Sequence, residues 1–167
     1  MRQEKRDERI LTAAERYTLE QRCLKERAST LHIQIYSYED RVAKGAMMSM
    51  LDKTVIPFIG LDQLCLFAEE YLIHKAVFDG IDTGRRWISK NTACETWQEY
   101  LGHSEMIVKN REPYKFAVRF LAQGNQSLQG ELRVDNRKCY FRSGMELMRL
   151  MHQWLQIKYK RRTRRNE

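Results

Sequence analysis

The residues best suited to acid–base chemistry in this sequence are the triplet Asp82-Thr83-Gly84. The same residue types form the active loop of aspartic proteases, where two carboxylates share one proton and activate a water molecule. That chemistry needs a second such carboxylate and apolar strands around the triplet, whereas Arg85 and Arg86 follow it directly here. Because a match of three residues is weak, we interpret the triplet as a turn and not as a catalytic loop.

The histidines and cysteines could bind a metal ion or act as nucleophiles, but they are scattered along the chain. No histidine lies within one helical turn of another histidine or a cysteine, whereas zinc sites normally include a close ligand pair. The cysteines are 42, 29 and 45 residues apart, which is typical of reduced thiols in a cytoplasmic protein. There is also no P-loop, dinucleotide-binding glycine pattern or serine elbow. We therefore predict no metal ion, no cofactor and no enzymatic activity. The residues concerned are His32, His74, His103 and His152, with Cys23, Cys65, Cys94 and Cys139.

Positive charge is densest at the C-terminal end. The net charge is +8, and residues 158–167 hold six basic side chains and one acid, which leaves +3 for the rest of the chain. Clustered Lys and Arg bind a phosphate backbone by releasing its counterions, whatever the base sequence. An acidic protein, a lipid surface or no partner at all are alternatives that the charge pattern leaves open. A weaker group of cations surrounds Trp87, whose ring could stack on a base. The predicted nucleic-acid-binding residues are Lys158, Lys160, Arg161, Arg162, Arg164 and Arg165 in the tail, with Arg85, Arg86 and Lys90 beside Trp87.

The elements that would position these residues begin with a helical pattern. From Ile10 to Val42, apolar or small residues recur at steps of three and four, as on one face of an α-helix. Residues 30–37 also alternate as a strand would, but the longer register continues through them, so we predict one long helix within residues 1–53. Such a helix must pack along its length, either on the rest of the chain or on a second copy as a coiled coil. A homodimer through this helix is thus one expected assembly.

Residues 54–112 are predicted to be a helical region. Residues 54–60, which include Pro57, are interpreted as a connector. The apolar face of residues 61–72 predicts a helix. A second, shorter helix is expected to begin at residues 92–95, whose Thr and Glu match a capping box.

The period of the pattern changes from about 3.6 to 2 after Pro113. Apolar residues alternate over 114–121, and turn signals separate this run from extended segments at 127–134 and 139–141. This arrangement is typical of an antiparallel meander of three strands.

A second capping box, Ser143-Gly-Met-Glu146, predicts a helix that covers one face of this sheet. We expect its covering side to consist of Met145, Met148, Met151 and Leu155, and we interpret these methionines as core and not as an adaptable partner-binding face. Residues 113–157 would then form a small sheet with its helix, followed by the basic tail. Helices and strands segregated in this way indicate the α+β class, with a long N-terminal helix and helical region before the three-stranded meander.

A chain of 167 residues can bury an apolar core without disulfides or metals. No run approaches the roughly 18 apolar residues that cross a bilayer, and the N-terminus lacks the pattern of a signal peptide. We therefore predict neither a membrane span nor secretion.

Two stretches resemble short uncharacterised proteins of clostridial bacteria that often lie near mobile elements. They are Pro57-Phe-Ile-Gly-Leu-Asp-Gln-Leu-Cys-Leu66, and the run from Gln129-Gly-Glu-Leu to Phe141-Arg-Ser-Gly-Met-Glu-Leu-Met148. The resemblance implies a bacterial cytoplasm and a mobile-element context, and no activity or site. In that context the chain is similar to anti-CRISPR inhibitors in size and charge only, and not in sequence.

We therefore expect a non-catalytic basic protein that binds nucleic acid or a protein complex that handles nucleic acid. A mobile-element inhibitor of a host defence nuclease is the most specific form of this hypothesis. The alternative is a scaffold or adaptor, dimerised through the N-terminal helix as a coiled coil, that binds protein partners.

Overall fold

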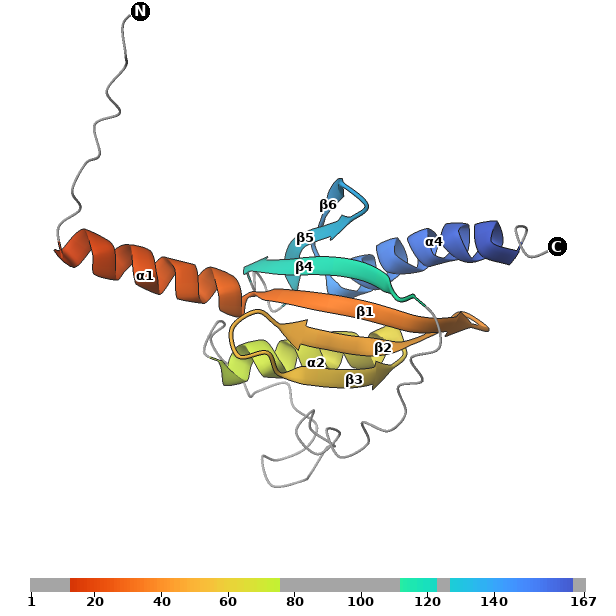
Figure 1. Cartoon of the computed structure of the whole chain (residues 1–167), viewed down its shortest axis with the longest axis horizontal. Helices are drawn as coiled ribbons and strands as arrows, with labels where there is room; N and C mark the ends of the chain where they lie inside the picture. Colours follow the sequence, from red (N-terminus) through yellow and green to blue (C-terminus); the bar gives the residue numbers. More distant parts are fainter. Residues whose placement is uncertain (1–12, 76–111, 123–126, 164–167) are drawn as a thin grey trace, which may run out of the picture.

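The computed structural model describes residues 13–75, 112–122 and 127–163, which form three helices and a six-stranded antiparallel sheet (Figure 1). The predicted α+β class is confirmed. The elements are α1 (Ala13–Ala28), β1 (Thr30–Glu39), β2 (Val42–Ser49), β3 (Val55–Ile59), α2 (Leu61–His74), β4 (Tyr114–Ala122), β5 (Gln129–Val134), β6 (Arg137–Phe141) and α4 (Gly144–Thr163).

The sheet has the strand order β3-β2-β1-β4-β5-β6, and every neighbouring pair is antiparallel. The predicted meander of β4, β5 and β6 is present, but it is only half of the sheet. The other half comes from the N-terminal part of the chain, which was predicted to be helical, and β1 and β4 pair at the centre to join the two halves.

The predicted long N-terminal helix is wrong, because α1 ends at Ala28 and the chain continues as β1 and β2. Leu31, Ile33 and Ile35 alternate along β1 and are buried on one side of the sheet. A β-bulge between Ile35 and Ser37 then shifts the register, and Tyr38 returns to the buried side. Because the bulge adds one residue to the strand, the buried residues Leu31, Ile35 and Tyr38 follow one another at steps of four and then three. This spacing is the same as on one face of a helix. The coiled coil expected through Val42 is lost with this helix.

The predicted connector at residues 54–60 is also wrong, since Val55–Ile59 forms the edge strand β3. Proline is tolerated in an edge strand because its missing N–H can face away from the neighbouring strand. The helix predicted at residues 61–72 is confirmed as α2. The helix expected from residue 92 lies outside the described residues.

The second capping box is confirmed, with one difference of partner. The backbone N–H of Glu146 donates to Oγ of Ser143 over 3.1 Å. The Glu146 carboxylate in turn accepts from the backbone N–H of Arg142 over 2.8 Å, and not from Ser143 as in the standard box. This pair of bonds fixes the point at which α4 begins.

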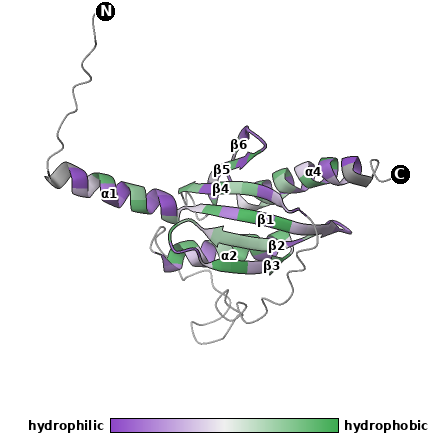
Figure 2. Cartoon of the chain, in the orientation of Figure 1, coloured by the Kyte–Doolittle hydropathy of each residue, from purple (hydrophilic) through white to green (hydrophobic). Residues whose placement is uncertain are grey.

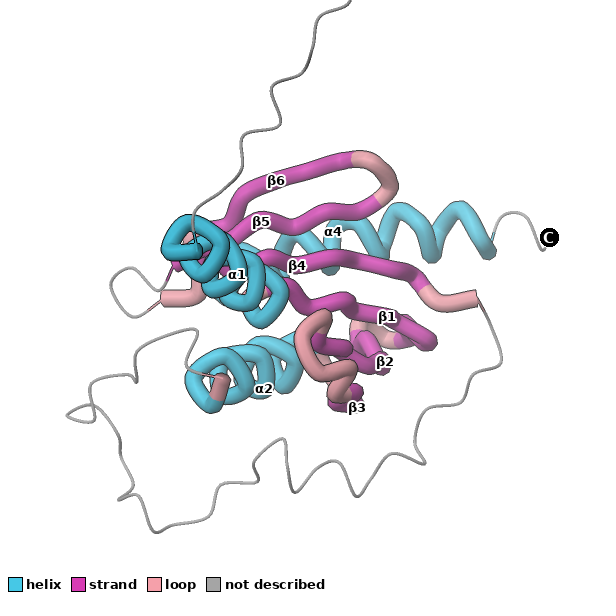
Figure 3. The backbone as a smooth tube through the Cα atoms, turned by 60° about the vertical axis from the view of Figure 1, so that its left-hand side comes forward, coloured by secondary structure: helices cyan, strands magenta, loops and turns pink. Residues whose placement is uncertain are grey.

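Both α2 and α4 lie against the same face of the sheet, and the core lies between them and the strands (Figures 1 and 3). The buried side of α4 consists of Leu147, Met151 and Leu155. Met148 packs partly against this core, but Met145 is 62% exposed, so its predicted place on the covering side is wrong. Hydrophobic residues concentrate in the sheet and in α2, whereas α1 and the last turns of α4 are mostly hydrophilic (Figure 2).

The chain contains an internal repeat that the sequence analysis missed. Each half is a three-stranded meander followed by a helix, and the palindromic strand order relates the halves by an approximate two-fold axis between β1 and β4. The two edge strands end in the same way, because Oε1 of Gln63 accepts from the N–H of Ile59 over 2.7 Å just as Glu146 accepts from Arg142. The β-bulge of β1 comes directly after the residue that pairs with Gly45, and the β-bulge of β4 comes directly after the residue that pairs with Gly130. The two glycines are therefore equivalent.

Candidate nucleic-acid interface

The basic tail proposed from sequence begins inside a helix. Helix α4 continues to Thr163, and its C-terminal end projects beyond the sheet (Figure 1). Lys160 and Arg161 are exposed on this end. Arg162 also belongs to the helix, whereas Arg164 and Arg165 lie outside the described residues, as do Arg85, Arg86 and Lys90.

Lys158, at the same end of α4, is bound to the fold by two contacts. Its ammonium group forms an ion pair with Oδ2 of Asp135 over 2.6 Å and lies 4.9 Å from the ring centre of Trp154. Trp154 itself packs edge-on against Tyr114 and Phe116. Lys158 thus ties α4 to the β5–β6 turn, and its charge is largely neutralised there.

Two hollows adjoin along α4, where the turn between β1 and β2 approaches the helix. Their volumes are about 280 and 450 Å³, and Arg41 and Gln156 line both. We call the combined surface the basic groove. It is lined by three cations, two amides, rings and one carboxylate. Its residues are Arg41, Arg149, Lys160, Gln153, Gln156, Tyr38, His152, Tyr159, Met145, Met148 and Asp40.

Arg41 reaches the groove from a tight two-residue turn. Asp40 and Arg41 have φ of 50° and 65°, as in the turns with two left-handed residues that best join twisted antiparallel strands. The second position of such a turn favours glycine, because a Cβ in the left-handed region is strained. An arginine therefore holds this place at an energetic cost, beside a helix that carries further cations.

The floor of the groove is made of anchored aromatic rings. Tyr38 is buried, and its hydroxyl lies 3.1 Å from Nδ1 of His152 in a hydrogen bond. Burial raises the pKa of Tyr38, so its hydroxyl stays neutral at physiological pH. The ring of Tyr159 packs edge-on to Tyr38 at 6.1 Å and remains 40% exposed. Tyr159 thus offers an aromatic surface beside Lys160.

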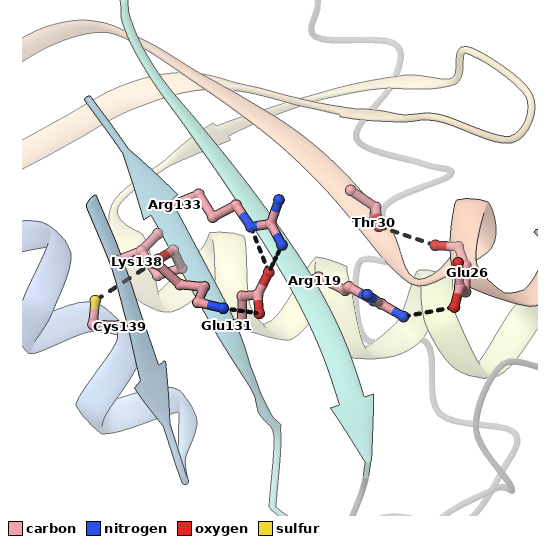
Figure 4. A network of polar contacts seen from close by, with 8 residues as sticks. Glu26, Thr30, Arg119, Glu131, Arg133, Lys138 and Cys139 are labelled. Atoms are coloured by element: carbon pink, nitrogen blue, oxygen red, sulfur yellow. Dashed lines mark hydrogen bonds and ion pairs between the residues drawn. The ribbon is translucent and has the colours of Figure 1, made fainter. Parts of the chain in front are cut away.

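A second group of cations lies on the sheet face opposite the helices, where each cation has a carboxylate partner (Figure 4). Arg133 and Lys138 both pair with Glu131, whose side chain is buried between them. Arg119 pairs with Glu26 of α1 over 2.9 Å. A hollow of about 410 Å³ lies over this face beside α1. These three cations share two carboxylates, which leaves the group a net charge of +1, whereas the basic groove has three cations against one carboxylate, a net charge of +2. We therefore regard the basic groove as the stronger anion-binding surface.

The arrangement of the groove suits binding better than catalysis. Its cations attract an anion, its amides can both donate and accept hydrogen bonds, and its tyrosine can stack on a planar ring. Over residues 13–75, 112–122 and 127–163, no three His, Cys, Asp or Glu side chains gather closely enough to hold a metal ion. None of the helices in these ranges has the length and apolar character to cross a membrane.

Sequence reasoning found Lys160 but missed Arg41 and the rest of the groove. Arg41 was placed on a continuous helix, far from α4. The signal that could have found it is the pair Asp40-Arg41 between two alternating apolar runs, which is a hairpin signal once residues 30–39 are taken as a strand.

Comparisons with protein-family models, with curated proteins and with solved structures found no match to this chain. Its function must therefore be argued from its own residues.

Proposed function

We propose that this protein binds nucleic acid non-catalytically, through phosphate contacts made by the basic groove. The observation that carries the proposal is the position of Arg41, which occupies a strained left-handed turn position and lines both hollows beside α4. Strained residues persist where their conformation serves a purpose. A guanidinium is well suited to bind a phosphate, because its fork of donors matches two phosphate oxygens.

The composition of the groove supports the same ligand. Arg41, Arg149 and Lys160 carry three positive charges, against one negative charge from Asp40. Gln153 supplies an exposed amide one turn from Arg149, and amides bind base edges. Arg161 extends the positive surface along the projecting end of α4. A nucleic acid held within a protein complex presents the same phosphates, so the proposal covers both forms of the partner.

The test replaces three groove cations at once. The variant Arg41→Gln, Arg149→Gln, Lys160→Gln removes the positive charge of the groove and keeps side chains that can hydrogen-bond. The matched control replaces Arg16, Arg22 and Lys25, three exposed cations of α1, and changes the net charge equally. Fluorescein-labelled 20-nucleotide single-stranded DNA, duplex DNA and single-stranded RNA would be titrated at several salt concentrations, with anisotropy as the readout.

We expect the groove variant to lose affinity for at least one probe, and the slope of log K against log salt to fall in magnitude. Each lost phosphate contact should reduce that slope by about 0.9 on duplex DNA or about 0.7 on a single strand. The α1 variant should bind almost as the unmodified protein does. An equal loss in both variants would mean that net charge alone drives binding, and no binding by the unmodified protein would refute the proposal.

A second candidate function, a self-associating adaptor, is supported by α1. Tyr17 and Leu24 lie seven residues apart on this helix and are 65% and 46% exposed, and this spacing puts them on one side of a helix that can pair with a copy of itself. Light scattering would test it. A dimer that dissociates in a Tyr17→Glu, Leu24→Glu variant would support the adaptor, and a monomer at all concentrations would exclude this pairing.

A further inference from the structure

The two edges of the sheet are equivalent by the internal two-fold axis but differ in their free backbone groups. At the β3 edge, Pro57 has no N–H, and the N–H of Ile59 is bonded to Gln63. These are two of the outward-facing positions of that strand, since the N–H of Gly60 between strand and helix points inward to Ala43. Proline at an edge and capture of edge amides both prevent a further strand from pairing. The β3 edge is therefore protected against pairing with a further strand.

The β6 edge lacks these devices over most of its length. The N–H of Arg142 points outward and is captured by Glu146. Because outward and inward groups alternate along a strand, the N–H and C=O groups of Tyr140 and Lys138 also point outward. The register with β5 across the two-residue turn at Asp135 and Asn136 leads to the same assignment. In the part of the chain that the structure describes, no element lies alongside β6 (Figure 3).

The side chains around this edge define the kind of strand that would pair with it. On the face opposite the helices, Lys138 and Tyr140 are exposed, and the exposed Arg133 lies directly across from Lys138. On the helix side, the edge presents the exposed Arg137 next to the turn, and then Cys139 and the buried Phe141. An added strand would thus meet cations on one face, and on the other face one cation beside the turn followed by Cys139 and Phe141.

A second copy of this chain is a poor occupant of the edge. Pairing β6 with itself would bring Arg137 and Lys138 of both copies together on one short strand pair that contains no acidic residue, so the two strands would repel each other. An acidic strand would instead find complementary charge there.

We propose that β6 is a docking edge for an extended acidic segment of a partner protein, which adds to the sheet as a seventh strand. The segment alternates acidic residues, facing Lys138 and Arg133, with apolar residues on the helix side. Backbone bonds to Lys138 and Tyr140 supply affinity, and the alternation of side chains supplies selectivity. This site goes beyond the proposed nucleic-acid function and uses none of the groove residues.

The chain itself suggests the test, because Tyr140 is the two-fold equivalent of Pro57. Tyr140→Pro should remove the outward N–H without breaking a bond to β5, just as Pro57 does in β3. Tyr140→Val is the control, since it removes the ring but keeps the N–H. The probe is the peptide (Glu-Val)₄-amide with fluorescein on its N-terminus, and the equally labelled (Lys-Val)₄-amide is its charge-reversed counterpart. Binding is followed by the fluorescence anisotropy of the labelled peptide and by the amide NMR signals of Lys138 and its neighbours.

We expect the acidic peptide to bind and to shift the Lys138 amide signal, and the basic peptide not to bind. Tyr140→Pro should weaken binding at least about tenfold, as expected when a hydrogen bond of the docked strand is lost. Tyr140→Val should bind within a few-fold of the unmodified protein. Circular dichroism would establish that both variants fold, and nucleic-acid binding should be unchanged in both. Equal binding by the two variants, or no preference for the acidic peptide, would overturn the proposal. So would a dimer that only Tyr140→Pro dissociates, because the edge would then bind a second copy.

Discussion

Gly45 on β2 and Gly130 on β5 have the same surroundings in the two halves of the sheet. A Cβ atom on either would collide with the carbonyl oxygen of the neighbouring central strand, at Gln34 for Gly45 and at Arg119 for Gly130. It would also press on an edge-strand aromatic ring, Phe58 in one half and Phe141 in the other. Each half of the repeat therefore depends on a glycine beneath a phenylalanine, next to the bulge of the central strand.

This contact predicts that Gly130→Ala destabilises the protein by about 2–3 kcal/mol, because the added methyl group meets backbone that cannot move aside. Urea denaturation would measure the change. Gly144→Ala is the matched control, since a Cβ there would make ordinary contacts of 3.7 Å or more with Cys65 and Leu128, and alanine is favoured in a helix. Equal stability of the two variants would show that the sheet adjusts freely at Gly130.

A second prediction concerns acid stability and rests on Asp52. Its carboxylate pairs with Nζ of Lys75 over 2.7 Å and accepts a hydrogen bond from the Tyr71 hydroxyl over 3.0 Å. Burial acts to raise the pKa of Asp52, but hydrogen bonds from Lys75, Thr54 and Tyr71 outweigh it and hold the pKa well below its ordinary value. A carboxyl group with a lowered pKa stabilises the fold above its unfolded-state pKa of about 4, and this contribution is lost as the pH falls below that value.

We therefore expect the melting temperature to fall as the pH is lowered from about 5 to 2, with part of the fall due to Asp52. Asp52→Asn should melt several degrees lower at pH 7 and should lose less on acidification. Melting curves followed by circular dichroism at half-unit pH intervals would measure both. The same acid dependence in the variant would assign the effect to other carboxylates.

The sequence predicted the second half of the fold well because its signals there are local and agree with one another. Alternation from Tyr114, turn residues before each new strand, and a capping box at Ser143 all indicate the same elements. In the first half the local signals conflict. The bulge in β1 gives a strand the spacing of a helix, and Pro57 suggests a connector where an edge strand tolerates it.

The internal repeat could have resolved this conflict. Phe58, Gln63 and Leu64 have the same spacing as Phe141, Glu146 and Leu147, so the β-β-β-α order of the second half predicts the order of the first. Even so, the basic groove could be predicted only in part. Lys160 belongs to a charge cluster that is visible in the sequence. Arg41 lies near Lys160 only because the turn between β1 and β2 approaches α4.

The last prediction separates the two roles of Arg41. At φ 65° the backbone of Arg41 is strained by its Cβ atom, so Arg41→Gly should relieve that strain. A gain in stability of about 0.5–1 kcal/mol should remain after the added entropy of the unfolded chain is subtracted. The same change removes a cation from the groove, so nucleic-acid affinity should fall several-fold and the salt slope by about 0.9 on duplex DNA.

Asn136→Gly provides the control for this trade-off, because Asn136 has φ 61° at the matching position of the β5–β6 turn and lies outside the groove. Asparagine tolerates the left-handed conformation better than arginine, so its replacement should raise stability less and leave binding unchanged. Urea denaturation and anisotropy on the same preparations would measure both quantities. A more stable Arg41→Gly variant with weakened binding would mean that the arginine is kept for its ligand at the expense of the turn. A more stable variant with unaltered binding would remove Arg41 from the interface, and with it the observation on which the proposed function rests.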